Sequence, residues 1–158
     1  MTTENMWGAA SGMLTRLLHV VDRSVLREIT DRLAPYRLSQ PQAVTVCYLH
    51  DHADEDVYQR TLERELGLSN PTVAAMVKSL IANDVVYRIR SKTDRRYYRL
   101  KLTSHGEELY EPARDVLTSV SRKYEEMLEP DEVAELMRLL GKLYPHPTEK
   151  EVEASQQS

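Results

Sequence analysis

The stretch that decides the fold is Val57–Leu102, VYQRTLERELGLSNPTVAAMVKSLIANDVVYRIRSKTDRRYYRLKL. In its first part, apolar or partly apolar side chains recur in steps of four from Tyr58 to Leu66, a spacing that places them on one face of a helix. Gly67 follows at once, and glycine readily takes the positive φ with which many helices end. We therefore expect a short helix over Val57–Leu66, closed by a glycine turn.

A second helix is predicted from Asn70 to Ala82. Ser69 precedes it as the N-cap, and Pro71 lies in its first turn, where the missing N–H of proline removes no helical hydrogen bond. Two short helices separated by a glycine turn of this length are typical of a helix-turn-helix unit. The inward face of the second helix is predicted to consist of apolar residues spaced by three and four, namely Val73, Met76, Val77 and Leu80.

Two β-prone runs follow, Val85–Arg90 and Tyr97–Leu102, joined by six polar residues. Residues 88–101 contain seven basic residues and one acidic residue, a net charge of +6, in a chain whose formal net charge is −4; the remainder therefore carries −10. A basic hairpin in an acidic chain is typical of a polyanion contact. The alternative is a solvated, charged edge hairpin, which its position directly after a helix-turn-helix disfavours.

The flanking sequence predicts long amphipathic helices. Residues 5–34 carry an apolar stripe and end at Pro35, and a helix from Ser104 to Leu128 is predicted to kink at Pro112. A final helix is predicted from Pro130 to about Tyr144, and the polar residues after it are predicted to form a disordered tail. The predicted fold is mainly α with a small β-wing: a winged helix-turn-helix over residues 38–102, flanked by helices over residues 5–34 and 104–144, and a tail over residues 145–158.

The apolar faces of the flanking helices exceed what one small domain can cover, which predicts a homodimer. Apolar runs are too short to span a membrane and no secretory signal is found, so we expect a cytoplasmic protein without membrane contact. The chain has no glycine-rich phosphate loop, nucleophile elbow or HExxH pattern. We therefore predict no enzyme, no catalytic residues and no cofactor.

Two parts of the sequence could act as a sensor of oxidants or metals, and each also has a simpler structural interpretation. Cys47, the single cysteine, is either a redox sensor or a buried inert thiol, and we favour the inert thiol because no cation lies nearby in sequence. The run His50–Asp56, HDHADED, is either a divalent metal site or a solvated acidic loop. We favour the loop, because ordering a flexible segment around a metal is costly, and we predict no metal.

The chain resembles the MarR-type transcriptional regulators, winged-helix dimers of bacteria and archaea. Looser similarity covers residues 13–143. The D-x-R wing followed by L-T-x-x-G is fairly specific to this family. The residues that carry the resemblance are Gln59, Leu62, Leu66–Ser69, Thr72, Leu80, Val85, Val86, Arg88, Asp94–Arg96, Leu102, Thr103 and Gly106.

The resemblance implies a sequence-specific DNA-binding regulator, usually a repressor, that binds a palindromic operator in double-stranded DNA as a homodimer. It implies that the helix Asn70–Ala82 enters the major groove and that Arg95 or Arg96 enters the minor groove, with Asp94 paired to a neighbour such as Arg88. The candidate contacts on the helix are Ser69, Asn70, Thr72, Val73, Ala75, Lys78 and Ser79, and those on the wing are Arg88, Arg90, Lys92, Asp94, Arg95, Arg96 and Arg99.

Two positions depart from the family pattern. Many members carry Ser or Thr followed by Arg where this chain has Ala74 and Ala75, and alanine can touch only a thymine methyl. Many also carry Gly where this chain has Asp84. Base specificity is therefore left to Asn70, Thr72, Lys78, Ser79 and the wing, or to DNA shape. The alternative is a winged-helix module for protein contacts that has lost specific DNA binding.

Family members are often released from DNA by a small aromatic or phenolic ligand, bound in a crevice between the dimer layer and the winged helix. In this chain the aromatic, apolar and basic residues suited to such a pocket could equally be ordinary core or surface residues, and we favour that simpler interpretation. The candidates are Trp7, Met13, Leu17, Tyr36, Arg37 and Tyr48.

Overall fold

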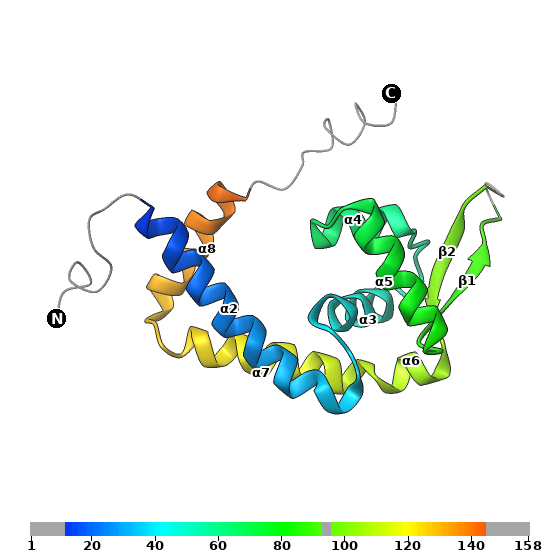
Figure 1. Ribbon diagram of the computed structural model, residues 1–158, viewed down its shortest axis with the longest axis horizontal. Helices are drawn as coiled ribbons and strands as arrows, with labels where there is room; N and C mark the ends of the chain where they lie inside the picture. The colour runs from blue at the N-terminus through cyan, green and yellow to red at the C-terminus, as the bar shows by residue number, and fades with distance from the viewer. Residues whose placement is uncertain (1–11, 93–95, 145–158) are drawn as a thin grey trace, which may run out of the picture.

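The computed structural model describes residues 12–92 and 96–144 of the chain. Over these residues the chain is mainly helical with one two-stranded hairpin, which confirms the predicted fold class (Figure 1). The elements are α2 (Met13–Leu33), the 3-10 turn η1 (Ala34–Tyr36), α3 (Gln40–Asp51), α4 (Gln59–Leu66), α5 (Asn70–Ala82), β1 (Val86–Arg90), β2 (Tyr98–Leu102), α6 (Ser104–Glu108), α7 (Tyr110–Glu125) and α8 (Pro130–Leu143).

The two helices of the helix-turn-helix are α4 and α5. Gly67 ends α4 with φ 62°, and α5 has the predicted bounds, so both expectations for this turn are confirmed. The apolar face of α5 is buried as predicted. Ser69 occupies the N-cap position, but its hydroxyl lies 2.8 Å from the Thr72 hydroxyl and makes no cap bond to a backbone N–H.

Helix α4 begins two residues later than the sequence predicts. Val57 is 2% exposed, and its carbonyl accepts a hydrogen bond of 2.8 Å from the Leu100 N–H. Tyr58 forms a β-bridge with Arg99. The segment before α4 is therefore extended and pairs with β2, a long-range contact that overrides the local helical pattern.

The hairpin is antiparallel and pairs Val86 with Leu102, Arg88 with Leu100, and Arg90 with Tyr98. Side chains of paired residues lie on the same face of the sheet. The inner end of this face, formed by Val86, Leu100 and Leu102, is buried in the core, whereas the outer end is exposed. The hairpin is thus anchored at its base and projects a basic tip away from the core (Figure 1).

The predicted helix Ser104–Leu128 is instead two helices, α6 and α7, that meet at Leu109. Pro112 has no N–H to donate to the residue four positions earlier, so the chain breaks within that turn rather than kinking at Pro112. The Thr103 hydroxyl caps α6 by accepting from the Gly106 N–H at 2.9 Å. The Glu107 carboxylate of α6 lies 2.6 Å from His50 Nδ1 of α3.

The protein is elongated, with α7 running along its length (Figure 1). At one end, α2 packs on α7, and α8 lies at this same end; at the other end lie α4, α5 and the hairpin. Buried residues from α2, α3, α4, α5, the hairpin and α7 form one continuous hydrophobic cluster. The division into a helical layer and a winged unit stays a prediction, and residues 5–11 and 145–158 of that prediction lie outside the described residues.

Helices α2 and α8 leave apolar side chains uncovered. On α2, Leu14 is 59% exposed and Val21 54% exposed; on α8, Met137 is 69% exposed and Leu136 45% exposed. No residue of α8 is buried. None of the helices in the described ranges is both long and apolar enough to cross a membrane.

Candidate nucleic-acid interface

The outer face of α5 is small and weakly charged. Asn70, Thr72, Ala75 and Lys78 are exposed, and Lys78 is the single cation of this helix. Ser79 is partly covered, because its hydroxyl accepts from Gln42 Nε2 at 3.3 Å and from Asn83 Nδ2 at 3.4 Å. A helix with this surface can approach a groove closely and can touch base edges only near its first turn and at Lys78.

Val73 does not belong to this outer face. Its side chain is completely buried, among the core residues of α5, so its inclusion among the candidate DNA contacts is wrong. The four-residue apolar spacing had already placed it inward, and a buried valine offers neither a hydrogen bond nor surface to a base.

The sequence interpretation missed a carboxylate of α4 that lies against the first residue of α5. Glu63 of α4 accepts a hydrogen bond of 2.6 Å from Asn70 Nδ2 and one of 3.4 Å from Gln59 Nε2. Glu63 is half-buried and Asn70 is exposed. Glu63 and Asn70 are seven residues apart and lie on opposite sides of the glycine turn. This spacing could have indicated a contact between the two helices of the unit.

Basic side chains of the wing lie next to tyrosine side chains. Arg90 donates to the Tyr98 hydroxyl at 3.1 Å and lies 5.6 Å from the centre of that ring. This hydrogen bond lowers the pKa of Tyr98 below its ordinary value. Arg96 lies 5.9 Å from the ring centre of Tyr97. Alternating basic and aromatic side chains can serve both phosphates and sugars, and counting charges alone had overlooked the tyrosines.

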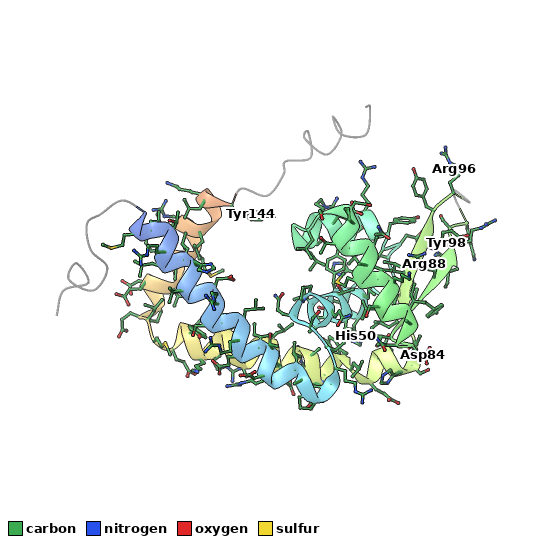
Figure 2. All side chains as sticks on the ribbon, in the orientation of Figure 1. His50, Asp84, Arg88, Arg96, Tyr98 and Tyr144 are labelled. Carbon is green, nitrogen blue, oxygen red and sulfur yellow. The ribbon has the colours of Figure 1, made fainter. Side chains whose placement is uncertain are left out.

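Arg88, Arg90, Lys92 and Arg96 are exposed, and their role as DNA contacts stays a prediction. Figure 2 shows Arg96 near the tip of the wing and Arg88 nearer α5. Asp94 and Arg95 lie outside the described residues, as does the predicted pairing of Asp94 with Arg88.

Arg99 is directed away from the predicted DNA contact. Its guanidinium lies 2.7 Å from the Asp56 carboxylate, and its side chain is only 18% exposed. The bond from Arg99 lowers the pKa of Asp56 below its ordinary value. Lys101 donates to the carbonyl oxygens of Ala53 and Glu55. These two cations bind the acidic loop, so the structure does not support the inclusion of Arg99 among the DNA contacts.

A groove of about 510 Å³ separates the wing from the start of the helix-turn-helix. Asn70 and Glu63 lie on one side, and Arg88 and Tyr98 lie on the other. Three arginines line it, which gives the groove cations for a nucleic-acid backbone. The full lining is Tyr58, Gln59, Arg60, Glu63, Asn70, Arg88, Arg96, Tyr97, Tyr98 and Leu100.

The predicted ligand pocket does not form as one site. Tyr36 and Arg37 line a cavity of about 140 Å³ together with His105. Tyr48 is stacked on His52 instead, with ring centres 4.0 Å apart. Met13 and Leu17 lie on the N-terminal half of α2, and Trp7 lies outside the described residues. The described candidates are therefore dispersed over α2, η1 and α3.

The two possible sensing segments have simple environments. Burial raises the pKa of the Cys47 thiol to about 11, with a further contribution from Asp51, and this disfavours the reactive thiolate. In the loop, His52 Nδ1 lies 2.8 Å from the Tyr48 carbonyl oxygen, and Asp56 pairs with Arg99. Within residues 12–92 and 96–144, no group of three or more His, Cys, Asp or Glu side chains could hold a metal ion.

Comparison with known proteins gives consistent matches. Residues 38–96 match the model of the MarR family. The transcriptional regulator MgrA of Staphylococcus aureus is 32% identical over 129 residues, which cover 80% of this chain and 84% of MgrA.

Two solved structures have similar folds. The S. aureus MepR–DNA complex superposes with a TM-score of 0.77 at 20% identity, over 82% of this chain and 94% of MepR. A mutant of MarR from E. coli, complexed with operator DNA, superposes with a TM-score of 0.74 at 25% identity, over 84% of this chain and 94% of that protein. The likeness to MepR concerns the fold alone.

Proposed function

The chain belongs to the MarR family of winged-helix transcriptional regulators, and from that premise we propose that it is a repressor that binds a palindromic DNA operator as a homodimer. Its relatives are transcriptional regulators, and the protein is a DNA-binding regulator rather than an enzyme. The observation that carries the proposal is the projection of α5 and a basic, tyrosine-bearing wing from one end of the molecule (Figure 2). The E. coli MarR mutant was solved with operator DNA, which supports the same mode for this chain.

The major-groove element is α5, with Asn70, Thr72 and Lys78 as the exposed polar candidates on its outer face. The wing contributes Arg96 near its tip, and narrow minor grooves attract arginine. Arg88 and Arg90 lie on β1 and are suited to phosphates. Base reading thus falls to α5 and positioning to the wing.

The proposed dimer would cover the exposed apolar faces of α2 and α8. Leu136, Met137 and Leu143 of α8 are 45%, 69% and 58% exposed in the single chain. An apolar surface of this kind usually marks an interaction site. A two-fold dimer places two recognition helices about one DNA turn apart, and this geometry requires a palindromic site.

The proposal includes release from DNA by a small aromatic or phenolic ligand. The cavity beside Tyr36, Arg37 and His105 also contacts Leu80 of α5 and Leu109. A ligand held there by the arginine would press on the recognition helix. Titration of the protein–operator complex with salicylate as probe tests this part: we expect reduced DNA binding, and weaker inhibition for Arg37→Ala. Unchanged binding would refute release by this class of ligand.

The central test is selection of bound duplexes from a random DNA pool at about 100 mM salt, because salt weakens the sequence-independent binding to phosphates. We expect enrichment of a palindrome with half-site centres about ten base pairs apart. A folded protein that enriches no sequence would contradict the proposal and would favour a protein-contact module, for which Ala74 and Ala75 would be the first residues to study.

A further inference from the structure

We propose that Asn70 reads an adenine in the major groove and that Glu63 is the positioning residue that holds it in the reading orientation. This inference rests on the proposed function, because it assigns a base contact to the helix that we place in the groove. It also answers a problem set by the sequence. Ala74 and Ala75 cannot hydrogen-bond a base edge, so the specificity of α5 must come from elsewhere.

The orientation of the Asn70 carboxamide is fixed by chemistry. A carboxylate only accepts hydrogen bonds, so the amide nitrogen, not the amide oxygen, must face Glu63. The distance of 2.6 Å from Nδ2 to Glu63 Oε1 is that of a charge-assisted bond, which is stronger than a neutral one. Gln59 Nε2 lies 3.4 Å from the same oxygen. Glu63 therefore gathers two amide donors and leaves the Asn70 oxygen pointing elsewhere.

The free edge of the carboxamide matches one base. The amide nitrogen of Asn70 carries two hydrogens, one on the same side as Oδ1 and one on the opposite side. Because the Glu63 carboxylate repels Oδ1, it binds the hydrogen on the side opposite Oδ1. The other N–H and Oδ1 remain side by side on the opposite edge of Asn70. Adenine presents a donor and an acceptor, N6–H and N7, which is the complement of that edge.

The other bases fit less well. Guanine presents two acceptors in the major groove, and one of them would face Oδ1 of Asn70 without a proton between them. Cytosine offers only a donor and thymine only an acceptor, so each satisfies half of the edge. Glu63 also adds negative charge beside Asn70, which further disfavours the two acceptors of guanine.

The surroundings suit a base contact rather than a simple tie between α4 and α5. Asn70 is exposed and lies at the first residue of α5, the end of a recognition helix that reads base edges. It lines the groove opposite Arg88 and Tyr98, so a duplex held by the wing would pass Asn70. Glu63 is half-buried and lies beside Asn70 on the same side of the groove, where it acts on the base through Asn70.

The test measures base preference at every operator position for wild type and three variants, starting from the sequence that the selection experiment enriches. For wild type we expect one adenine per half-site to be preferred by about 5- to 150-fold, the range of a bidentate contact. Asn70→Ala should lose discrimination at that position alone. Glu63→Ala should lose it at the same position, and Glu63→Gln, which keeps an acceptor oxygen, should retain most of it.

Glu65→Ala is the matched control. Glu65 also lies on α4 and is a carboxylate, but it pairs with Arg64 at 3.0 Å instead of reaching α5. Removing either glutamate lessens repulsion from phosphates, and this electrostatic contribution should be the same for every sequence. Only the Glu63 variant should change the preference at one base, a readout that a merely structural tie would leave unaltered. Thermal unfolding of each variant checks that the fold is kept.

A measurement on wild type alone covers the case in which a variant fails to fold. Replacing the preferred adenine by 7-deazaadenine removes N7 without changing base pairing, and we expect about 2- to 12-fold weaker binding, the value of one hydrogen bond. An enriched operator whose preferences are unchanged in Asn70→Ala or Glu63→Ala would overturn this inference and leave the proposed function standing. Absence of any enriched operator would instead overturn the proposed function.

Discussion

The Arg99 guanidinium donates to the Asp56 carboxylate across 2.7 Å and so joins the second strand of the wing to the loop before α4. The neighbouring Lys101 reaches the same loop through two carbonyl oxygens. Arg99 and Lys101 are thereby held by the loop, whereas Arg88, Arg90, Lys92 and Arg96 are exposed. These contacts join the wing to the loop that precedes the helix-turn-helix.

Replacing Asp56 by Asn should lower the free energy of unfolding near neutral pH but not in acid. The bond from Arg99 depresses the pKa of Asp56. A carboxyl with a depressed folded pKa stabilises the fold above its unfolded pKa, and this contribution is lost as pH falls through the folded pKa. Urea unfolding should show the gap between wild type and Asp56→Asn closing from about pH 6 to about pH 2.

Asp54→Asn is the control for this experiment, because Asp54 is an exposed carboxylate of the same loop without a side-chain partner in the described ranges. The difference in unfolding free energy between Asp54→Asn and wild type should stay small at every pH. A difference between wild type and Asp56→Asn that did not depend on pH would contradict the role of the ion pair.

Arg96→Ala should weaken operator binding while leaving the dimer intact. Arg96 is exposed near the tip of the wing, and loss of a charge-assisted contact there should cost about 1.5–3 kcal/mol per wing. Fluorescence anisotropy with labelled operator measures the change, and Arg122→Ala on α7 serves as the charge-matched control. Equal operator affinities for wild type and Arg96→Ala would show that Arg96 is not a DNA contact.

Leu136→Asp should prevent dimerisation. The Leu136 side chain is 45% exposed in the single chain and lies on the face that we propose the partner covers, where an aspartate would be buried without a cation. We expect the dimer dissociation constant to rise by about 30-fold or more, equivalent to ~2 kcal/mol at an interface hot spot. Sedimentation equilibrium measures it, and Leu136→Met should dimerise as wild type does. A dimer unaffected by the aspartate would place the interface elsewhere.

Gly106→Ala should destabilise the fold, whereas Gly141→Ala should not. A Cβ on Gly106 would overlap the Val85 carbonyl oxygen, a backbone atom that cannot move aside without shifting the base of the hairpin. Overpacking of this kind costs about 1–3 kcal/mol. A Cβ on Gly141 meets nothing within 4 Å, and alanine favours a helix over glycine by about 1 kcal/mol. Chemical denaturation of the two variants should therefore shift in opposite directions.

The Cys47 thiol should react slowly with alkylating reagents. Its pKa is raised to about 11 by burial, against an ordinary value of 9.0, so its thiolate fraction at neutral pH is about 100-fold lower. Iodoacetamide labelling followed across pH measures this directly, since the chain has one cysteine. Protein unfolded in urea should regain ordinary reactivity. Fast labelling of the folded protein at pH 7 would restore the redox-sensor alternative.

Local patterns were sufficient where short-range rules decide the structure. Gly67 and Pro71 bracket the turn of the helix-turn-helix, and the start of α5 at Asn70 follows from them. The resemblance to the MarR family likewise rested on residues of the turn and the wing, and Gly106 of the L-T-x-x-G motif proves to lie against the backbone of Val85.

Contacts between different elements account for what the sequence interpretation did not find. Val57 looks helical locally, but Leu100 binds its carbonyl from 43 positions away. Arg99 looks like any other wing cation until Asp56 is placed beside it, and Glu63 looks like a surface residue until the turn brings it to Asn70. In each case the partner lies on another element, and no spacing within one element reveals it.

Some cations of the wing are bound within the protein and others are exposed, and this difference affects how the protein would search a chromosome. Arg99 and Lys101 are occupied by the loop, and α5 adds only Lys78. Random DNA retains a protein according to the number of phosphates it neutralises, and sliding along the duplex depends on that retention. We expect brief visits to random sequence and an operator residence time set chiefly by base contacts, so a small change in the reading edge of α5 would redirect the protein to other sites.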